Sequence, residues 1–300
     1  MEHPLHVAAF GEILWDVLPQ KKCLGGAPFN CAAHMNRLGF NTTMISALGD
    51  DALGTEALRV ISQEQMDSSF IQVQNDFPTG QTDVILKNGS PSYEFNMPCA
   101  WDAISLGEGM LANIASLQLD VFCFGSLVQR SKKSRDTLFS ILKIIHSPII
   151  FFDVNLRKEF YTKDVIARSL EYATILKLNN EELPILCSMF GYPQDELAFL
   201  KNISFDFNLD GVILTKGSQG AMAWFENTQY QVCPGPVHVV DTVGAGDSFS
   251  AAFLFVYAQT HAVQKALETG SALADFVVSH DGAIPSYTAA LKNRIAAFCL

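Results

Sequence analysis

Two glycines, an alanine and a carboxylate follow one another at Gly244, Ala245, Gly246 and Asp247, within the longer stretch Asp241–Phe249. The residues after Asp247 are apolar at helical spacing and on the other faces too, which predicts a turn followed by a buried helix. The first N–H groups of a helix lack internal partners and carry the positive end of its dipole, so they suit a phosphate. Beside that phosphate, Asp247 could accept a proton from a hydroxyl. In isolation, the same residues also fit an ordinary turn with a capping aspartate.

A second group of polar residues lies near the amino end of the chain. Asp16 ends the stretch Gly11–Asp16, and the diglycine Gly25-Gly26 precedes Asn30. Carboxylate and amide side chains can pair with neighbouring hydroxyls of a sugar, and glycine lets the sugar ring come close to the backbone. Taken alone, the two segments fit a surface loop with a helix cap equally well.

Two further polar runs follow expected strands. Arg157 ends the run Asp153–Arg157, which comes at the carboxyl end of an apolar segment, where open α/β sheets bind ligands. Its planar guanidinium suits phosphate oxygens, although a structural ion pair would also explain the run. Asn179 and Glu182 lie three positions apart after another strand, so they can face a ligand together or form a capping box at a helix start. The two roles are compatible.

In this order, the motifs resemble the signature of PfkB-type, ribokinase-like carbohydrate kinases, and especially of bacterial fructokinases. The resemblance covers essentially the whole chain and implies one ribokinase-like domain over residues 1–300. The matching stretches are, in chain order, residues 11–16, 25–30, 48–51, 153–157, 179–182 and 241–247.

The resemblance implies a role for each matching residue. Asp247 would be the general base, and Arg157 would lie beside the transferred phosphoryl group. The N–H groups of Gly244, Ala245 and Gly246 would stabilise the charge that develops on that group. The residues implied for sugar binding are Asp16, Gly25, Gly26, Asn30, Arg157 and Asp247.

The resemblance also implies ATP and Mg²⁺ as cofactors, with K⁺ as a third candidate. Asn179 and Glu182 would organise Mg²⁺ through water molecules. Asp241 and Thr242 would line the site of the monovalent cation. The residues implied for ATP binding are Lys177, Asn179, Thr215, Gly217, Gly244, Gly246 and Gly282.

The activity implied is phosphoryl transfer from ATP to D-fructose, giving fructose 6-phosphate and ADP. The alternatives are another sugar, a sugar acid or a nucleoside as acceptor, for example ribose, tagatose, 2-keto-3-deoxygluconate or adenosine. A non-catalytic sugar-binding relative is a further alternative, against which Asp247 and the two glycines argue. The chain has no P-loop, Gly-x-Ser-x-Gly or His-Glu-x-x-His signature. The run Gly107–Ala112 mimics a dinucleotide fingerprint, but it follows no convincing strand and is interpreted as a loop.

An extended segment is expected at Val237–Val240, before the glycine turn. Along the chain, the elements that must position the site residues alternate between strand and helix. This alternation predicts an α/β fold, a three-layer sandwich with a mostly parallel central sheet flanked by helices. The expected strands are 6–11, 42–48, 121–124, 149–154, 174–178 and 212–215. The expected helices are about 26–38, 51–65, 133–146, 164–171, 180–190 and 264–280, besides the one after Asp247.

One region breaks the alternation. Segments 82–86 and 92–97 flank Asn88-Gly89, which predicts a β-hairpin. With the polar segment 12–24, this hairpin is expected to form a small separate sheet. We predict that it is a lid over the site, formed by residues from about 12–35 and 79–102. Family resemblance suggests a homodimer through this lid.

Composition limits the class of protein. Apolar residues make up 49% and charged residues 17% of the chain, which predicts a compact fold. The net charge of −11, without a lysine or arginine cluster, disfavours nucleic acid as a partner. No apolar run is long enough to span a bilayer, and the first residues do not resemble a secretory signal, so a cytoplasmic location is expected. The seven cysteines are scattered and predict neither a disulfide framework nor a zinc site.

Overall fold

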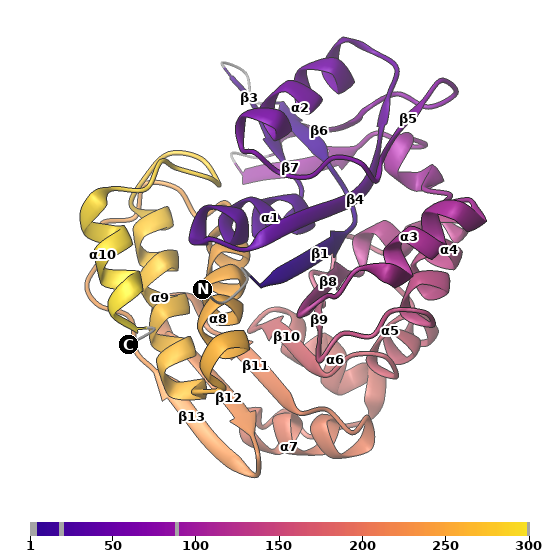
Figure 1. Cartoon of the computed structure of the whole chain (residues 1–300). Helices are drawn as coiled ribbons and strands as arrows, with labels where there is room; N and C mark the ends of the chain where they lie inside the picture. Colours follow the sequence, from indigo (N-terminus) through magenta and orange to yellow (C-terminus); the bar gives the residue numbers. More distant parts are fainter. Residues whose placement is uncertain (1–4, 18–20, 88–89, 299–300) are drawn as a thin grey trace.

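The computed structural model describes residues 5–17, 21–87 and 90–298 (Figure 1). In this part of the chain, a large sheet of nine strands forms the centre of the molecule. Its strands are, in spatial order, β13 (Thr228–Val232), β12 (Ala221–Phe225), β11 (Gly211–Thr215), β10 (Ile175–Asn179), β9 (Ile149–Asp153), β8 (Val121–Gly125), β1 (His6–Phe10), β4 (Asn41–Gly49) and β5 (Ile71–Gln74). Strands β11 to β13 pair antiparallel, and the other neighbours pair in parallel. The predicted mostly parallel sheet is confirmed.

Helices cover both faces of the large sheet. On one face lie α1 (Ala27–Leu38), α2 (Ala52–Gln63), α8 (Ala245–Thr260) and α9 (Val263–Val278), with α10 (Ala289–Phe298) packed on α9. On the other face lie α3 (Glu108–Ser116), α4 (Lys132–Leu142), α5 (Lys163–Leu170), α6 (Glu182–Phe190) and α7 (Glu196–Asp206). The three-layer sandwich expected from the alternating pattern is therefore present.

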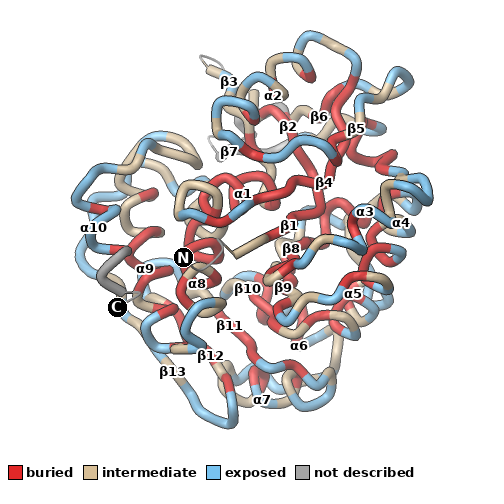
Figure 2. Tube along the Cα trace, viewed as in Figure 1, coloured by how far each residue is buried: buried red, intermediate tan, exposed pale blue. Residues whose placement is uncertain are grey.

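The strands alternate their side chains between the two layers, as an extended backbone requires. Along β8, Val121 and Cys123 pack with the helices of one face, whereas Phe122 and Phe124 pack with those of the other. Figure 2 shows that the buried segments run along the central strands and the inner sides of the helices. Because both faces of the sheet are covered, polar groups can collect only at the strand ends and in the loops.

A second sheet of four strands, counted within the described residues, lies beside α2 and above α1 in the view of Figure 1. Its order is β3 (Lys22–Gly25), β2 (Leu14–Val17), β6 (Gly80–Lys87) and β7 (Ser90–Phe95). Strands β6 and β7 form the predicted hairpin, while its expected turn Asn88-Gly89 lies outside the described residues. Thr79 donates its backbone N–H and its hydroxyl to Asp51, the N-cap of α2, at 2.8 and 2.7 Å. The motif at 48–51 thus anchors the start of β6.

The range predicted for the lid is wider than the small sheet. Residues 27–35 of the predicted range 12–35 belong to α1, which packs against β1, β4 and α8 of the main body. The helix starts there because Gly26 ends the extended segment and Pro28 fixes the first turn. At the other end, residues 100–103 form a buried 3₁₀ turn in the main core.

Several other expectations are corrected. No strand forms at Val237–Val240, since the N–H groups of Val240 and Asp241 bond to the carbonyl of Val278 at the end of α9, not to a neighbouring strand. Helix α3 begins at Glu108, with Gly107 as its N-cap, where a loop was predicted. Helix α4 ends at Leu142 and not near residue 146. The elements β5, β12, β13, α7 and α10 were not predicted.

Helix α8 is buried along most of its length, as predicted from its apolar faces. It packs between α1 and α9, and a Cβ atom at Gly270 of α9 would lie 3.0 Å from the Phe249 ring. This close packing fixes the amino end of α8 in space. Within the described residues, no helix is long and apolar enough to cross a membrane.

Candidate active site

The glycine turn before α8 has the geometry that the sequence predicts. Gly244 has φ 78°, in the left-handed region, and a Cβ atom there would lie 2.7 Å from Ala283. Glycine therefore lets the loop around Ala283 press against the turn. Among the described residues, the N–H groups of Gly246 and Asp247 have no hydrogen-bond acceptor, so the amino end of α8 is available to an anion.

Asp247 lies in the first turn of α8 and is half-buried. Asn30, on α1, donates its side-chain N–H to Asp247 Oδ2 at 2.8 Å. Burial raises the pKa of Asp247 to about 6, although the hydrogen bond from Asn30 opposes the rise. At neutral pH this carboxylate is ionised but more basic than an exposed aspartate. Such a group can accept a proton from a bound hydroxyl.

Four of the six predicted sugar-binding residues lie on β2, at the end of β3 and at the start of α1, namely Asp16, Gly25, Gly26 and Asn30. A Cβ atom at Gly25 would lie 2.9 Å from Asp16 Oδ2, and one at Gly26 would lie 2.3 Å from the Glu12 carbonyl oxygen. Burial raises the pKa of Asp16 to about 6, and the charges of Arg157 and Asp247 act on it in opposite directions. The structure therefore brings the amino-end motifs within electrostatic reach of the α8 turn.

Arg157 is exposed on the loop after β9, and its Nη1 donates to the carbonyl of Leu156 at 3.2 Å. Its positive charge favours the ionised forms of Glu12, Asp16 and Asp247, and so it opposes the rise in their pKa values that burial causes. The guanidinium thus lies within reach of all three carboxyl groups, with most of its donors directed to solvent.

Lys177 lies beneath the glycine turn. Its ammonium group is buried and forms a 2.8 Å ion pair with Asp153 Oδ2. A Cβ atom at Gly246 would lie 3.0 Å from the same ammonium group. Burial alone would lower the pKa of Lys177, but the charges of Asp153 and Glu182 and the hydrogen bond raise it overall. A fixed positive charge therefore supports the turn from below.

Asn179 and Glu182 form the reciprocal bonds of a capping box. The Asn179 side chain accepts from the N–H groups of Glu181 and Glu182, at 2.8 and 2.9 Å, and Glu182 Oε2 accepts from the Asn179 N–H at 2.8 Å. Glu182 Oε1 accepts from the N–H of Leu156. Both carboxylate oxygens are therefore engaged by the backbone. This arrangement fits Mg²⁺ held through water better than a directly ligated ion.

The remaining residues predicted for nucleotide or cation binding lie on neighbouring loops. Thr215 ends β11, and Gly217 starts the following turn with φ 53° and open space where a Cβ atom would be. Asp241 accepts from the N–H groups of Val243 at 3.0 Å and of Gly282 at 3.2 Å, which ties the loop before the α8 turn to the loop after α9. In the described part of the chain, no group of three or more His, Cys, Asp or Glu residues could hold a metal ion. Thr242 is exposed beside Asp241.

A comparison with known protein families identifies the family to which this chain belongs. The profile described as pfkB family carbohydrate kinase matches residues 10–290, nearly the whole chain. The chain belongs to the pfkB family of carbohydrate kinases. It is thus a phosphotransferase that acts on a hydroxyl of a sugar.

Individual relatives agree with this assignment. The fructokinase of Salmonella typhimurium is 29% identical over 262 residues, which cover 83% of this chain and 83% of that protein. The crystal structure of aminoimidazole riboside kinase from Salmonella enterica, complexed with aminoimidazole riboside and an ATP analog, has a TM-score of 0.81 at 25% identity and covers 98% of this chain and 100% of its own. An uncharacterized sugar kinase from Pyrococcus horikoshii, in complex with ATP, has a TM-score of 0.82 at 26% identity, with coverages of 98% and 100%.

In this carbohydrate kinase, sequence reasoning missed Glu12. The residue is buried, and burial raises the pKa of its carboxyl to about 7. Its Oε2 has no hydrogen-bond partner among the described residues. The available signal was a charged residue between the apolar Phe10 and Ile13, although that pattern gives no direction for the side chain.

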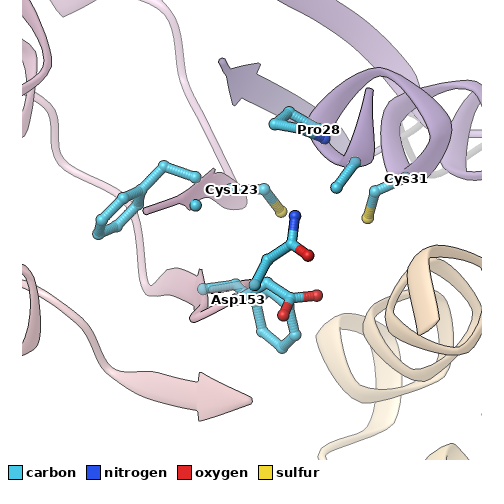
Figure 3. A pocket seen from close by; sticks show the side chains of 9 residues that line it. Pro28, Cys31, Cys123 and Asp153 are labelled. Atoms are coloured by element: carbon cyan, nitrogen blue, oxygen red, sulfur yellow. The ribbon is translucent and has the colours of Figure 1, made fainter. Parts of the chain in front are cut away.

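A small cavity also lies beside the kinase site, between α1 and the ends of β8 and β9 (Figure 3). Its volume is about 20 Å³, enough for roughly one water molecule. Cys31, Cys123 and Asp153 are among the side chains that line it. Asp153 Oδ1 has no hydrogen-bond partner within the described chain, so this cavity offers a polar atom to a water molecule.

Proposed function

We propose that this carbohydrate kinase transfers the γ-phosphoryl group of ATP to a hydroxyl of D-fructose, giving fructose 6-phosphate. The observation that carries the proposal is the 2.8 Å hydrogen bond between Asn30 and Asp247. It joins the helix of the sugar-binding motif to the glycine turn where a phosphate would lie. A hydroxyl bound beside Asp247 is therefore close both to a base and to the free amides of α8.

In the proposed reaction, Asp247 accepts the proton of the attacking hydroxyl. The N–H groups of Gly244 and Gly246 would stabilise the charge that develops on the transferred phosphoryl group, with Lys177 beneath them. The Ala245 N–H, which donates to the carbonyl of Thr242 at 3.3 Å in the free protein, would turn toward the same group. Arg157 supplies further donors from the open side of the site. Positioning and electrostatics do most of the work, because phosphoryl transfer needs little covalent chemistry from the protein.

The other residues proposed to contact ATP lie along the same edge of the large sheet. Bound Mg²⁺ would neutralise charge on the ATP phosphates, and the capping-box pair Asn179 and Glu182 would orient its water shell. Asp241 and Thr242 offer oxygen atoms, and oxygen atoms are the ligands that coordinate K⁺. The remaining residues proposed for ATP are Thr215, Gly217 and Gly282.

The small sheet is proposed to act as a lid. Asp16 lies on β2, within this sheet, so the lid itself contributes a sugar-binding carboxylate. Closure over the sugar would exclude water and limit ATP hydrolysis. The same sheet is the proposed dimer surface, and the cytoplasm is the proposed location.

Two observations favour different acceptors, so the acceptor must be tested directly. The S. typhimurium fructokinase is 29% identical to the chain, and the S. typhimurium aminoimidazole riboside kinase is 27% identical. We would measure ADP release and sugar phosphate with Mg-ATP across fructose, ribose, tagatose, 2-keto-3-deoxygluconate, adenosine and aminoimidazole riboside. A dominant response to fructose is expected. A dominant response to another acceptor would replace fructose, and silence across the panel with the protein folded would contradict the proposal.

A further inference from the structure

His34 is a buried histidine of α1 that the proposed reaction does not use. Both of its ring nitrogens are engaged, Nε2 with the carbonyl oxygen of Ala283 at 2.9 Å and Nδ1 with the hydroxyl of Tyr287 at 2.6 Å. A carbonyl oxygen can only accept, so Nε2 donates to Ala283 and Nδ1 accepts from Tyr287. Burial lowers the pKa of His34 to about 4, although the bond to Ala283 opposes the fall. At neutral pH the ring is therefore uncharged and held in one tautomer.

The carbonyl that accepts from His34 also lies against the glycine turn. A Cβ atom at Gly244 would lie 2.7 Å from Ala283 Cα and 2.8 Å from this same carbonyl oxygen. Gly244 is the N-cap of α8, so its position sets the direction of the first N–H groups of that helix. One carbonyl group thus connects the buried histidine with the amides proposed to meet the phosphoryl group.

Helix α1 reaches both ends of the glycine turn. Asn30 and His34 are four positions apart and therefore share a face of α1. Asn30 donates to Asp247 at one end of the turn, and His34 reaches Gly244 at the other end through Ala283. Because the sugar-binding motif leads directly into α1, this helix fixes the turn relative to the proposed sugar site.

The loop after α9 is held along three successive carbonyls. Arg37, also on α1, donates its Nη1 to the carbonyls of Ile284 and Pro285, at 3.2 and 2.8 Å. The third carbonyl is that of Ala283, and it is the one that lies beside Gly244. The loop is thus attached to α1 as a unit, and the histidine holds its contact with the turn.

We infer that His34 is a positioning residue for phosphoryl transfer, which acts through the Ala283 carbonyl to hold Gly244 and the amides of the glycine turn against the transferred phosphoryl group. This inference deepens the proposed function and rests on it. The amides stabilise charge that develops in the transition state, where a displacement of about 1 Å can cost about 10² in rate. Loss of the histidine bond should therefore lower kcat and leave the binding of sugar and of ADP unchanged.

The test compares H34N and H34Q with wild type. The glutamine amide reaches about as far as Nε2 and can donate to Ala283, whereas the asparagine amide reaches only about as far as Nδ1. For H34N we expect a kcat about 10- to 100-fold lower, with the KM for sugar and the KM for ATP within a few-fold of wild type. H34Q should bring kcat back to within a few-fold of wild type. An unchanged kcat in H34N, or a kcat in H34Q as low as that of H34N, would overturn the inference.

A transition-state analogue separates positioning from loss of folded protein. Mg-ADP with aluminium fluoride and the sugar resembles the phosphoryl group in transit, so its affinity depends on the amides of the turn. Calorimetry gives this affinity separately from the number of active sites. In H34N the affinity for the analogue should fall by about 10- to 100-fold, while the affinity for Mg-ADP alone stays at the wild-type value. Equal losses for both ligands would reduce the histidine to a structural role and overturn the inference.

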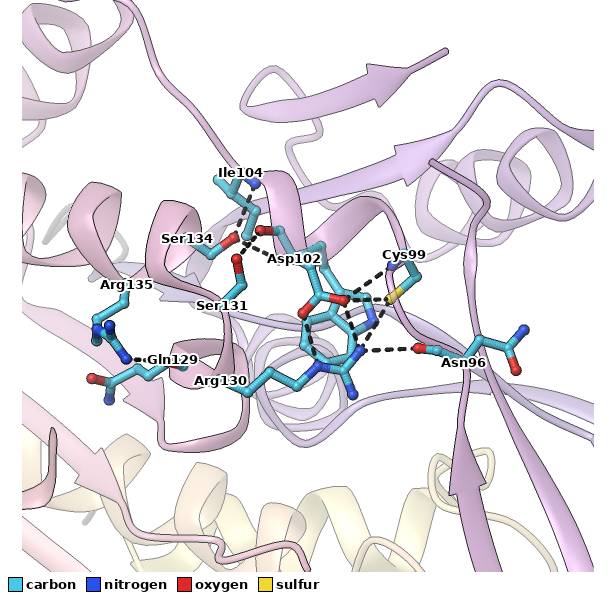
Figure 4. A network of polar contacts seen from close by, with 10 residues as sticks. Asn96, Cys99, Asp102, Ile104, Gln129, Arg130, Ser131, Ser134 and Arg135 are labelled. Atoms are coloured by element: carbon cyan, nitrogen blue, oxygen red, sulfur yellow. Dashed lines mark hydrogen bonds and ion pairs between the residues drawn. The ribbon is translucent and has the colours of Figure 1, made fainter. Parts of the chain in front are cut away.

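The matched control is S134A, in a second buried network on the other face of the large sheet (Figure 4). There Arg130 donates to both oxygens of Asp102, each at 2.8 Å. Ser134 accepts from the Ile104 N–H at 3.0 Å and donates to the Trp101 carbonyl at 2.7 Å. Like the histidine, it is buried and makes two hydrogen bonds, but its partners belong to the core away from α1 and α8. S134A should lower the melting temperature and keep the wild-type ratio of the two affinities. A change in this ratio as large as in the histidine variant would overturn the inference.

Two further measurements keep the test decisive. If neither His34 variant folds, Y287F replaces them, because it removes only the hydroxyl that fixes the ring. Its affinity for the analogue should be about 3- to 10-fold lower with Mg-ADP affinity unchanged, and an unchanged affinity for the analogue would overturn the inference. If wild type phosphorylates nothing in the panel, the proposed function fails. Binding of Mg-ADP with aluminium fluoride in the absence of sugar then still tests the histidine, and equal affinities in wild type and H34N would refute its role.

Discussion

The two sides of this site differ in how far the protein satisfies its own polar groups. On the ATP side, defined by Asn179, Glu182 and Asp241, each carboxylate or amide oxygen that we describe accepts a backbone N–H group. On the sugar side, defined by Glu12, Asp16 and Asn30, two of the three residues keep a buried atom without a partner in the described chain. These atoms are Glu12 Oε2 and Asn30 Oδ1.

The difference has a physical meaning. A satisfied group holds its loop in place whether or not a ligand is present, so the ATP side is a framework that is complete in the free protein. An unsatisfied buried group carries a cost that a matching ligand removes. Asp153 lies between the two sides, with one oxygen paired to Lys177 and the other free. We expect changes on the sugar side to act on substrate binding, and changes on the ATP side to act largely on stability.

The largest effect is expected for D247N, at the point where the two sides meet. Loss of the general base should lower kcat by a factor of about 10² or more, with ATP affinity largely kept. Because a buried charge is removed, the free energy of unfolding at pH 7.5 should rise by about 1–3 kcal/mol. Steady-state kinetics, nucleotide titration and thermal melts would check this. Full activity of D247N would show that another group is the base.

The second-largest effect is expected for a substitution that acts on the sugar side alone. D16A removes a carboxylate that lies against Gly25, so the KM for the sugar should rise by about 10- to 100-fold while the KM for ATP stays near that of wild type. The matched control is D210N, since Asp210 lies in the turn before β11, away from the sugar-binding motif. A parallel rise in both KM values for D16A would mean that the two sides are not separable.

A change on the ATP side should act largely on stability, in contrast to the change on the sugar side. E182Q replaces a carboxylate that accepts from two N–H groups by an amide with only one acceptor oxygen, so one buried N–H loses its partner. The free energy of unfolding should fall by about 1–3 kcal/mol. The Mg²⁺ concentration for half-maximal activity should change by no more than about tenfold, as expected for a contact through water. A melting temperature equal to wild type with a hundredfold weaker Mg²⁺ response would instead make Glu182 a direct ligand.

The sequence predicted six of the nine described strands of the large sheet, and the glycine turn, because both leave local signals. Buried parallel strands read as apolar runs, and the turn needs glycine at position 244, where φ is positive. The strand expected at Val237–Val240 failed because β propensity forms no strand without a neighbour to pair with. The range predicted for the lid runs to residue 35 and so includes part of α1, although a helix over about 26–38 was itself expected from the sequence.

Long-range pairs account for the rest. Arg130 and Asp102 are 28 positions apart, and no periodicity indicates that they meet. Glu12 is a charged residue in an apolar run, but the direction of its side chain depends on the packing of Gly26 against its backbone. The family resemblance named only residues within its motifs, and Arg130 and Asp102 lie outside them.

The pH dependence should give the smallest and most graded effect. Burial raises the pKa values of Asp247 and Asp16 to about 6 and that of Glu12 to about 7, above their ordinary values. The native state therefore binds protons more tightly than the unfolded chain between about pH 4 and 7, so the free energy of unfolding should fall as the pH rises through this window, by about 1–3 kcal/mol. Activity should rise over the same range, with kcat/KM half-maximal near pH 6, because Asp247 must be ionised to accept a proton.

Opposite slopes of stability and activity would arise from the same carboxyl groups. D210N again serves as the control, since burial also raises the pKa of Asp210, which lies outside the site. Its removal should flatten the stability profile slightly and leave the activity profile unchanged. An activity profile that is flat from pH 5 to 8 in wild type would mean that no buried carboxylate limits the reaction, and the sugar side would lose its role in proton transfer.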